Sequence, residues 1–187
     1  MSISIVGRLL RGVRAGERHL SWNHPAMRGA PETLVLQSAS FTAGGSLPQH
    51  CGGLGVGDNV SPALAWSGVP EGTQELLLTF EDEGAPLPRP VVHLVVLGID
   101  PAHPGFGEGA LTRGLEAPAR FGIGSFGRLG YYGPRPVPGH GPHRYVFQLF
   151  ALRRKLAFDR PPKLKEVLER ATGSVLARGR LVGLFER

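Results

Sequence analysis

The sequence of 187 residues contains one cysteine, Cys51. It has no apolar run near the roughly 18 to 20 residues that a membrane-spanning helix needs. A single cysteine excludes an internal disulfide, and the missing disulfide framework favours a reducing compartment. The first thirty residues lack the apolar core of a secretory signal. We therefore expect a cytoplasmic protein without a transmembrane segment, in which Cys51 is a structural thiol.

The sequence also lacks motifs for covalent or metal-dependent catalysis. It has no G-x-S-x-G elbow, and Cys51 and Ser61 stand in turn-forming segments with no base nearby in the sequence. His93 and His143 lie fifty residues apart, a spacing that matches no recognised zinc motif. The sequence therefore predicts no catalytic residue, no metal and no cofactor.

Acidic side chains are scarce at the two ends of the chain, which has a net charge of +6. Residues 1–30 carry five Arg against one Glu, and residues 152–187 carry ten Lys or Arg against four acids. Residues 31–151 instead have six Arg against ten acids. A nucleic-acid-binding protein needs a continuous basic face, which this distribution does not provide. We predict no nucleic-acid partner, and weak contact of the basic ends with an anionic membrane surface stays open.

Residues 1–30 form a basic N-terminal extension that precedes a single domain predicted for residues 31–187. The apolar residues of the extension at helical spacing are Val6, Leu9, Leu10 and Val13. This stripe predicts a short amphipathic helix. The preferred interpretation packs the helix on its own domain or on a partner subunit, as in a homodimer. A transit signal and a helix lying on a membrane surface are the alternatives.

Glycine and proline are abundant, with 28 and 17 residues, and favour turns and strands over long helices. Apolar and β-branched runs predict strands at residues 33–38, 63–66, 75–81, 91–97, 144–152 and 181–185. Pro161 and Pro162 can open a helix that ends near Gly173, and a second brief helix is predicted at residues 175–177. The chain is thus predicted to be mainly β, in the α+β class.

Three polar side chains stand at the ends of predicted strands. Asp82 ends one strand, His93 lies early in the next, and His143 opens a third after a loop dominated by Gly and Pro. Because strand side chains alternate between faces, His143, Tyr145 and Phe147 should share one face. This pattern predicts the wall of a pocket.

The segment 101–142 holds 11 Gly and 7 Pro. Irregular segments of this length often build functional sites. Two further histidines, His103 and His140, fall within it, and we expect both to be solvated.

Four segments carry motifs in a fixed order. Ser61–Pro70 has the pattern S-P-x-L-x-W-x-x-x-P, Glu81–Pro86 with His93 is similar to D-P-D-A-P…H, Gly139–Tyr145 has the pattern G-x-G-x-H-R-Y, and Leu181–Arg187 is similar to a terminal strand. Over residues 31–187 the chain therefore resembles the phosphatidylethanolamine-binding protein family, in its bacterial and archaeal Raf-kinase-inhibitor-like branch.

The resemblance implies a central antiparallel β-sheet with a smaller sheet packed on it, and a small pocket for a phosphate-like anion such as phosphate or a phospholipid head group. The implied ligand-binding residues are Asp82, Pro86, His93, Gly133, His143 and Tyr145. Residues 130–136 would form one wall. Two imidazoles that can be cationic near neutral pH, beside a carboxylate, suit an oxyanion, and a tyrosine hydroxyl and loop amides would add donors.

The sequence departs from the family motif at three positions. Glu83 stands in place of proline, Gly84 in place of the second aspartate, and Leu94 in place of a frequent aromatic residue. The change at Gly84 removes one acceptor and one negative charge beside the implied pocket. Glu83 cannot restore that geometry, because adjacent residues of an extended chain point to opposite faces.

The sequence leads to one preferred function and two alternatives. The preferred function is a regulatory, non-catalytic binding protein for a small anion such as phosphate or phosphoethanolamine. One alternative is a hydrolase-like enzyme that uses His93, His143 and Asp82 as acid–base groups. The other is a protein-interaction or inhibitor module that acts through its loops and the N-terminal extension.

Overall fold

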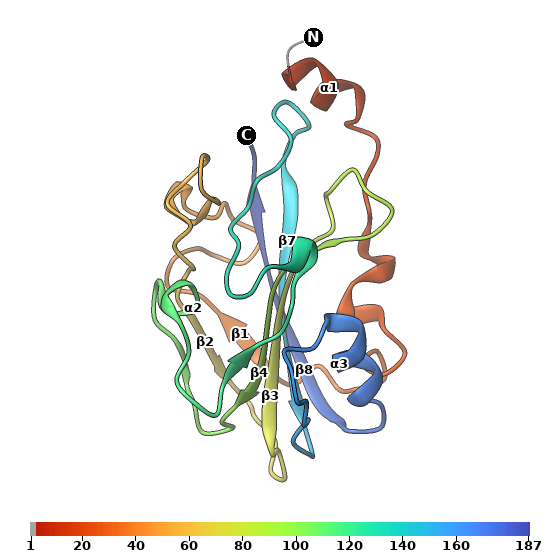
Figure 1. Cartoon of the computed structure of the whole chain (residues 1–187), viewed down its shortest axis with the longest axis vertical. Coiled ribbons are helices and arrows are strands. Elements are labelled where there is room, and N and C mark those ends of the chain that lie inside the picture. The colour runs from red at the N-terminus through yellow and green to blue at the C-terminus, as the bar shows by residue number, and fades with distance from the viewer. Residues whose placement is uncertain (1–2) are drawn as a thin grey trace.

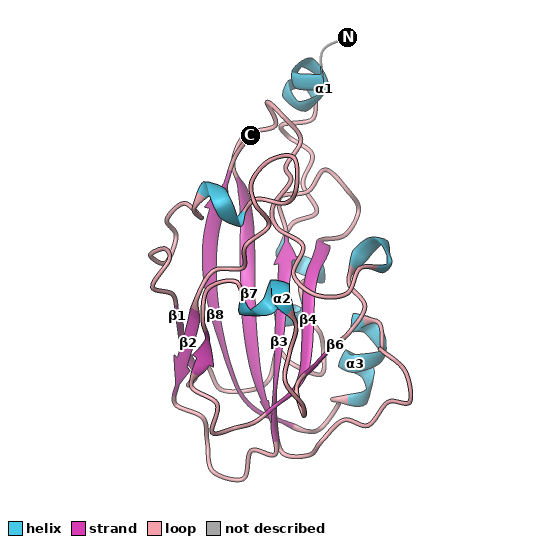
Figure 2. Ribbon diagram, turned by 60° about the vertical axis from the view of Figure 1, so that its left-hand side comes forward, coloured by secondary structure: helices cyan, strands magenta, loops and turns pink. Residues whose placement is uncertain are grey.

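A computed structural model describes residues 3–187 and contains two antiparallel sheets surrounded by short helices (Figure 1, Figure 2). The larger sheet has the strand order β6-β4-β3-β7-β8, and the smaller sheet has the order β1-β2-β5. The larger sheet comprises β3 (Glu75–Asp82), β4 (Val91–Ile99), β6 (Arg120–Phe121), β7 (His143–Leu152) and β8 (Val175–Phe185). The smaller sheet comprises β1 (Val35–Gln37), β2 (Leu64–Ser67) and β5 (Gly105–Phe106). The expected fold, a central antiparallel sheet with a smaller packed sheet, is confirmed.

The helical segments are short and peripheral. The α-helices are α1 (Ile3–Leu9), α2 (Ala110–Arg113) and α3 (Leu164–Arg170). The 3₁₀ turns are η1 (Glu17–His19), η2 (Ser21–Asn23), η3 (Gln49–Cys51) and η4 (Ser125–Gly127). Among the described helices, none combines the length and apolar content required to cross a membrane.

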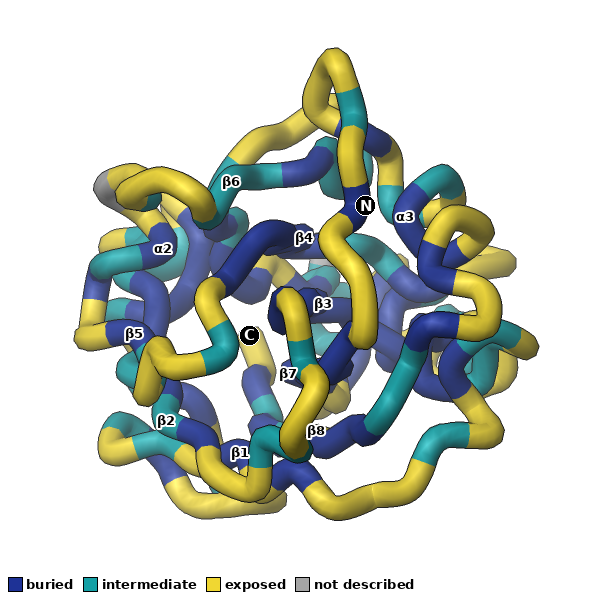
Figure 3. The backbone as a smooth tube through the Cα atoms, turned by 90° about the horizontal axis from the view of Figure 1, so that it is seen from below, coloured by how far each residue is buried: buried dark blue, intermediate teal, exposed yellow. Residues whose placement is uncertain are grey.

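The central strands are buried on both faces, as Figure 3 shows for β3, β4 and β7. Tyr145 and Phe147 of β7 belong to a core cluster that includes residues of the smaller sheet, such as Trp66. Val146 and Phe150 of the same strand belong to a second cluster on the α3 side. The alternation expected for this strand is therefore confirmed, and the larger sheet separates two apolar cores.

The prediction of a helix at residues 175–177 is wrong, because β8 runs without interruption from Val175 to Phe185. Gly173 has φ +74, a left-handed conformation that ends the helical turn and lets the chain reverse. Leu152 then pairs with Val175, and Ala151 pairs with Ala177. Hydrogen bonding to β7 thus overrides the local helical preference of this segment.

Residues around η2 anchor the N-terminal extension in the second core. Leu20, Trp22 and Met27 are buried against the outer face of the larger sheet. Trp22 N–H donates to Gln148 Oε1 at 2.6 Å, and Ser21 N–H donates to Glu81 Oε1 at 3.1 Å. Residues 20–27 therefore complete the apolar core.

The anchor includes a buried carboxyl group. Burial raises the pKa of Glu81, although hydrogen bonds from Ser21, Gln148 and Thr79 oppose the shift. The same carboxylate accepts from Gln148 Nε2 at 2.7 Å, so the extension and two neighbouring strands share one polar network.

Three of the four residues of the apolar stripe predicted on the N-terminal helix are exposed, and Leu10 is partly buried. Val6, Leu9 and Val13 are 41%, 73% and 47% exposed. Figure 1 shows α1 at the same end of the molecule as the loop that precedes β7 and the C-terminus. The segment is attached there through backbone groups and arginine side chains instead, which an apolar pattern could not predict.

We expect Trp22→Ala to lower the free energy of unfolding by about 3 to 5 kcal/mol, because it leaves a cavity between the extension and the larger sheet. Urea denaturation followed by circular dichroism measures the change. Leu9→Ala is the matched control, because Leu9 is exposed and its truncation should change stability by less than about 0.5 kcal/mol. Equal effects of the two substitutions would contradict the anchoring role of Trp22.

Candidate functional site

A cavity of about 270 Å³ lies where β3, β4 and β7 meet their loops. It is lined by Asp82, Ala85, Pro86, Leu87, Val91, His93, Phe126, Tyr132, Arg135, Val137 and His143. Four of the six residues implied by the sequence motifs, Asp82, Pro86, His93 and His143, therefore line one cavity. Gly133 and Tyr145 do not line it.

Strand register brings Asp82 and His143 together. Asp82 is the last residue of β3 and pairs with Tyr145, two residues after the start of β7 at His143. The His143 Nδ1 atom lies 2.9 Å and 3.2 Å from the two Asp82 carboxylate oxygens. Both side chains are buried, and because an ionised carboxylate only accepts, this geometry assigns a proton to His143 Nδ1.

A β-bulge turns His93 toward the same site. Phe80 pairs with Leu94, whereas Glu81 pairs with Val92, so His93 is the extra residue of β4. The His93 ring packs on Phe80, with 5.4 Å between ring centroids. Regular alternation would have placed His93 and Leu94 on opposite faces, and the bulge lets both face the core of Phe80.

The environment of His93 favours a neutral ring. His93 Nδ1–H donates to the carbonyl oxygen of Tyr132, and the two rings stack. Burial lowers the pKa of His93, although the Asp82 charge and the Tyr132 carbonyl oppose the shift. The expectation of two cationic imidazoles is therefore wrong for His93, because desolvation outweighs the nearby carboxylate.

Tyr145 lies behind the cavity with a fully buried ring. Its hydroxyl has no partner that meets hydrogen-bond geometry among the described residues. Burial, together with the Asp82 charge, raises the pKa of this hydroxyl, so Tyr145 keeps its proton. An interaction of the hydroxyl with the Asp82 carboxylate adds to this shift, so the donor is directed at Asp82.

Gly133 has a packing role. A Cβ at this position would lie 2.2 Å from the carbonyl oxygen of Cys51. Its N–H donates to Asn59 Oδ1 at 2.8 Å, and the Tyr132 N–H donates to the carbonyl of His93. These two loop amides are therefore already used, contrary to the expectation that they serve a ligand.

Gly84 is in close contact with His143. Its N–H donates to Asp82 Oδ1 at 2.8 Å, and a Cβ there would lie 2.8 Å from the His143 Cα. The neighbouring Glu83 points away and forms an ion pair with Arg144. The chain thus closes the loop onto His143 at the position where the family motif has an aspartate.

Two residues of the loop before β7 add polar groups that no strand pattern could identify. Arg135 donates to the Tyr132 hydroxyl at 3.1 Å, and both line the cavity. Arg128 stands 4.2 Å from the centre of the Tyr132 ring, in a cation–π contact. Arg135 therefore supplies positive charge at the cavity, and Arg128 lies against the ring of a lining residue.

His140 is a further residue of the site, and the sequence did not predict its place there. We expected it to be solvated, but it is fully buried, and its Nδ1 lies 2.8 Å from His143 Nε2. The expectation was wrong because residues 10–13 cover this loop, and no signal in the loop itself reports that contact.

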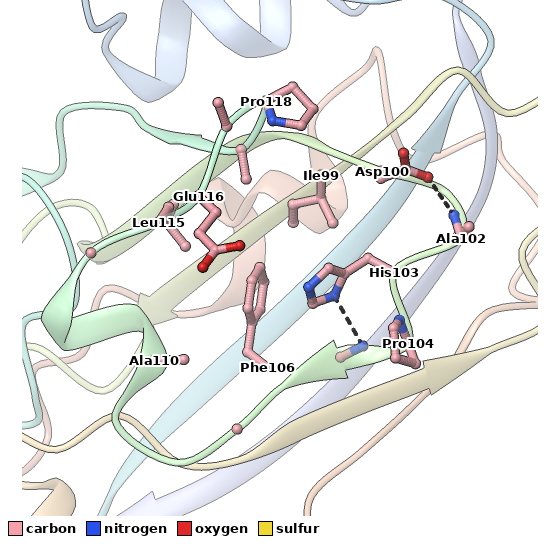
Figure 4. A pocket seen from close by; sticks show the side chains of 15 residues that line it. Ile99, Asp100, Ala102, His103, Pro104, Phe106, Ala110, Leu115, Glu116 and Pro118 are labelled. Carbon is pink, nitrogen blue, oxygen red and sulfur yellow. Dashed lines mark hydrogen bonds between the residues drawn. The ribbon is translucent and has the colours of Figure 1, made fainter.

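A larger hollow of about 700 Å³ lies beside β5 and α2 (Figure 4). Its polar side chains include Asp100, His103 and Glu116, which are exposed. Asp100 accepts from the Ala102 N–H, and His103 Nδ1 accepts from the Gly105 N–H. This hollow lacks the buried, convergent polar groups of the smaller cavity.

The described residues include no group of three or more His, Cys, Asp or Glu that could hold a metal ion. Burial raises the pKa of the Cys51 thiol to about 12, so it remains protonated and unreactive. The functional groups of the site are therefore imidazole, carboxylate, hydroxyl and guanidinium groups.

We expect Gly84→Asp, which introduces the aspartate of the family motif, to lower stability by about 1 to 3 kcal/mol through overpacking against His143. Gly29→Asp is the control, because a Cβ at Gly29 meets nothing within 4 Å. Thermal unfolding compares the two variants. A neutral effect of Gly84→Asp would show that the loop can move away from His143.

Comparison with known proteins gives concordant matches. Residues 37–186 match the family model for phosphatidylethanolamine-binding protein. The chain is 35% identical over 157 residues to a UPF0098 protein of Aquifex aeolicus, which covers 82% of this chain and 89% of that protein. YbcL of E. coli, described as a member of the mammalian family, has a TM-score of 0.76 and 29% identity, covering 83% of this chain and 99% of that one.

The homologue CT736 of Chlamydia trachomatis aligns with a TM-score of 0.74 and 28% identity, over 83% of this chain and 99% of that one. The resemblance seen in the sequence motifs is therefore confirmed. Because the family model covers most of the chain, and two solved structures share both fold and sequence with it, the chain belongs to the phosphatidylethanolamine-binding protein family.

Proposed function

We propose that the 270 Å³ cavity binds a small oxyanion, namely phosphate or the phosphoryl head group of a molecule such as phosphoethanolamine. Family membership supports a binding protein. The observation that carries the proposal is that Asp82, His93 and His143, three buried polar side chains, line one small cavity together with Arg135. A mostly apolar pocket with a few convergent polar groups is the usual arrangement of a small-molecule binding site.

The size of the cavity limits the ligand. Pockets for drug-sized molecules usually enclose about 300 to 1,000 Å³. A volume of about 270 Å³ suits a head group rather than an entire lipid. Leu87 and Phe126 are exposed at the cavity rim, so an apolar portion of a ligand can remain outside.

Charge at the mouth favours an anion. Arg135 lines the cavity, and Arg128 stands over the ring of Tyr132, another lining residue. Guanidinium groups bind phosphoryl oxygens well because their donors match the spacing of those oxygens. Asp82 opposes an anion, but its charge is offset by the imidazole that it contacts.

The enzyme alternative gains no specific support. In a His–Asp catalytic pair the second imidazole nitrogen must reach the substrate or the nucleophile. Here His143 Nε2 is directed at His140 Nδ1 instead. The protein-interaction alternative is favoured by the exposed apolar residues Val6, Leu9 and Val13 alone, so anion binding is the function that we propose.

We expect phosphate to shift the ring signals of His93 and His143 in two-dimensional NMR spectra, and His93→Ala to abolish the response. His103→Ala is the matched control, because His103 lies at the larger hollow and not at this cavity. Addition of phosphate to millimolar concentration without shifts at His93 or His143 would refute the proposed site.

We also expect the affinity for phosphoethanolamine to increase as pH falls from 8 toward 6.5, by up to about tenfold per pH unit for one proton taken up. The reason is that the lowered pKa leaves His93 neutral in the empty site, whereas a phosphoryl dianion there needs a shared proton. Calorimetric titration at several pH values measures the dependence. Constant affinity across this range would mean that His93 does not contact the phosphoryl group.

A further inference from the structure

His140 lies between the binding cavity and the N-terminal extension. Its Nδ1 is 2.8 Å from His143 Nε2, and its Nε2 is 2.8 Å from the carbonyl oxygen of Leu10 and 3.1 Å from that of Val13. His143 in turn contacts Asp82 through Nδ1. An unbroken hydrogen-bonded chain therefore connects the backbone of the extension to a carboxylate in the cavity wall.

The number of protons in this hydrogen-bonded chain follows from the groups at its two ends, the backbone carbonyls of the extension and Asp82. Carbonyl oxygens only accept, so His140 Nε2 must carry a proton. An ionised Asp82 only accepts, so His143 Nδ1 must carry a second. The contact between His140 Nδ1 and His143 Nε2 needs a third proton, which either of these two nitrogens can carry. Two neutral imidazoles supply only two protons, so this arrangement holds one more, and the pair is positively charged beside Asp82.

Residues 10–16, which we call the N-terminal strap, are held at both sides of the site. Arg11 Nε donates to the Gly139 carbonyl at 2.9 Å, and Arg14 donates to the Pro142 carbonyl at 3.0 Å. On the other side, Ala15 N–H donates to the Ala85 carbonyl at 2.8 Å. The strap therefore bridges the loop before β7 and the loop after β3.

The helix that leads into the strap approaches the same loop closely. A Cβ at Gly7 would lie only 2.0 Å from the carbonyl oxygen of Pro138. In contrast, a Cβ at Gly12 would meet nothing within 4 Å. Substitution at Gly7 should therefore push the strap away from the loop, and substitution at Gly12 should not.

We propose that the docked strap, acting through His140 as a positioning residue, fixes the extra proton on the His140–His143 pair and so sets the positive charge of the anion cavity. When the strap moves away, His140 Nε2 loses both carbonyl acceptors and the ring can adopt the other neutral tautomer. The third proton is then no longer required, and the pair becomes neutral. The inference deepens the proposed function and rests on it where it concerns ligand affinity.

Binding and docking are coupled in both directions. An anion that favours the charged pair must stabilise the docked strap by the same free energy by which the strap favours the anion. The cavity and the N-terminal extension thus form one thermodynamic unit. An anion in the cavity would therefore be detectable at the strap, whose Arg11 and Arg14 are exposed.

The charged and titratable groups around the pair come from every neighbouring element. Asp82 of β3 favours the extra proton by direct contact, whereas Arg11 and Arg14 of the strap oppose it. His93 of β4 and Tyr145 of β7 lie nearby as neutral groups, and Arg135 of the loop before β7, which lines the same cavity, also opposes the extra proton. The contact with Asp82 is buried and the strap arginines are exposed, so the carboxylate has the larger effect.

The direct test uses full-length protein with ¹⁵N-labelled histidine, because nitrogen chemical shifts distinguish protonated from unprotonated ring positions. In the wild type at pH 7 we expect three protonated nitrogens across His140 and His143. Gly7→Val should reduce the count to two and weaken phosphate binding about tenfold, and the matched Gly12→Val should change neither quantity. Three protonated nitrogens in Gly7→Val, or only two in the wild type, would overturn the inference.

A second pair of variants tests His140 itself. Gln in His140→Gln can donate to the strap carbonyls and accept from His143, so His143 should keep both protons. Phe in His140→Phe can do neither, and His143 should become neutral. Identical nitrogen shifts of His143 in the two variants would contradict a positioning role. Because the proton count is read without ligand, a count of three in the wild type and two in Gly7→Val without any phosphate response would support the strap and refute the proposed ligand.

Discussion

The contact between Asp82 and His143 is the interaction on which the organisation of this site depends. Antiparallel register pairs Asp82, the last residue of β3, with Tyr145, two residues from the start of β7 at His143, and the side chains of Asp82 and His143 meet where both strands leave the sheet. Buried ionisable groups need a partner, because desolvation of an unpaired charge is costly. The pair therefore stabilises two loops at the end of the larger sheet and fixes the orientation of an imidazole at the same time.

The loops are shaped around that pair. Gly84 allows the chain after β3 to close directly onto His143, and Glu83 is turned outward to Arg144. On the other side, His140 and the strap cover the second nitrogen of His143. The substitution of glycine for the aspartate of the family motif therefore belongs to a tighter arrangement, and the cavity persists beside it.

Much of the fold could be predicted from the sequence because strand signals in this chain are strong and local. Alternation along β7 correctly assigned Tyr145 and Phe147 to one face, and ordered motifs correctly indicated the family. The predictions that failed did so because of contacts between segments that are distant in the sequence. Pairing with β7 converted residues 175–177 into strand, and a bulge in β4 redirected His93.

The features of the site that escaped prediction also arise from contacts between distant segments. His140 is buried by residues 10–13, which are separated from it by most of the chain. Burial lowers the pKa of His93 and outweighs an adjacent carboxylate that the sequence did show. Residue types and spacing can identify candidate groups, but protonation depends on the packing around them.

A crystal structure of the protein soaked with phosphoethanolamine tests the central claim most directly. We predict a phosphoryl group inside the cavity of Asp82, His93 and His143, with an oxygen within hydrogen-bond distance, about 3 Å, of His93 Nε2. An empty cavity at millimolar ligand, or a ligand bound only in the larger hollow beside β5 and α2, would contradict it.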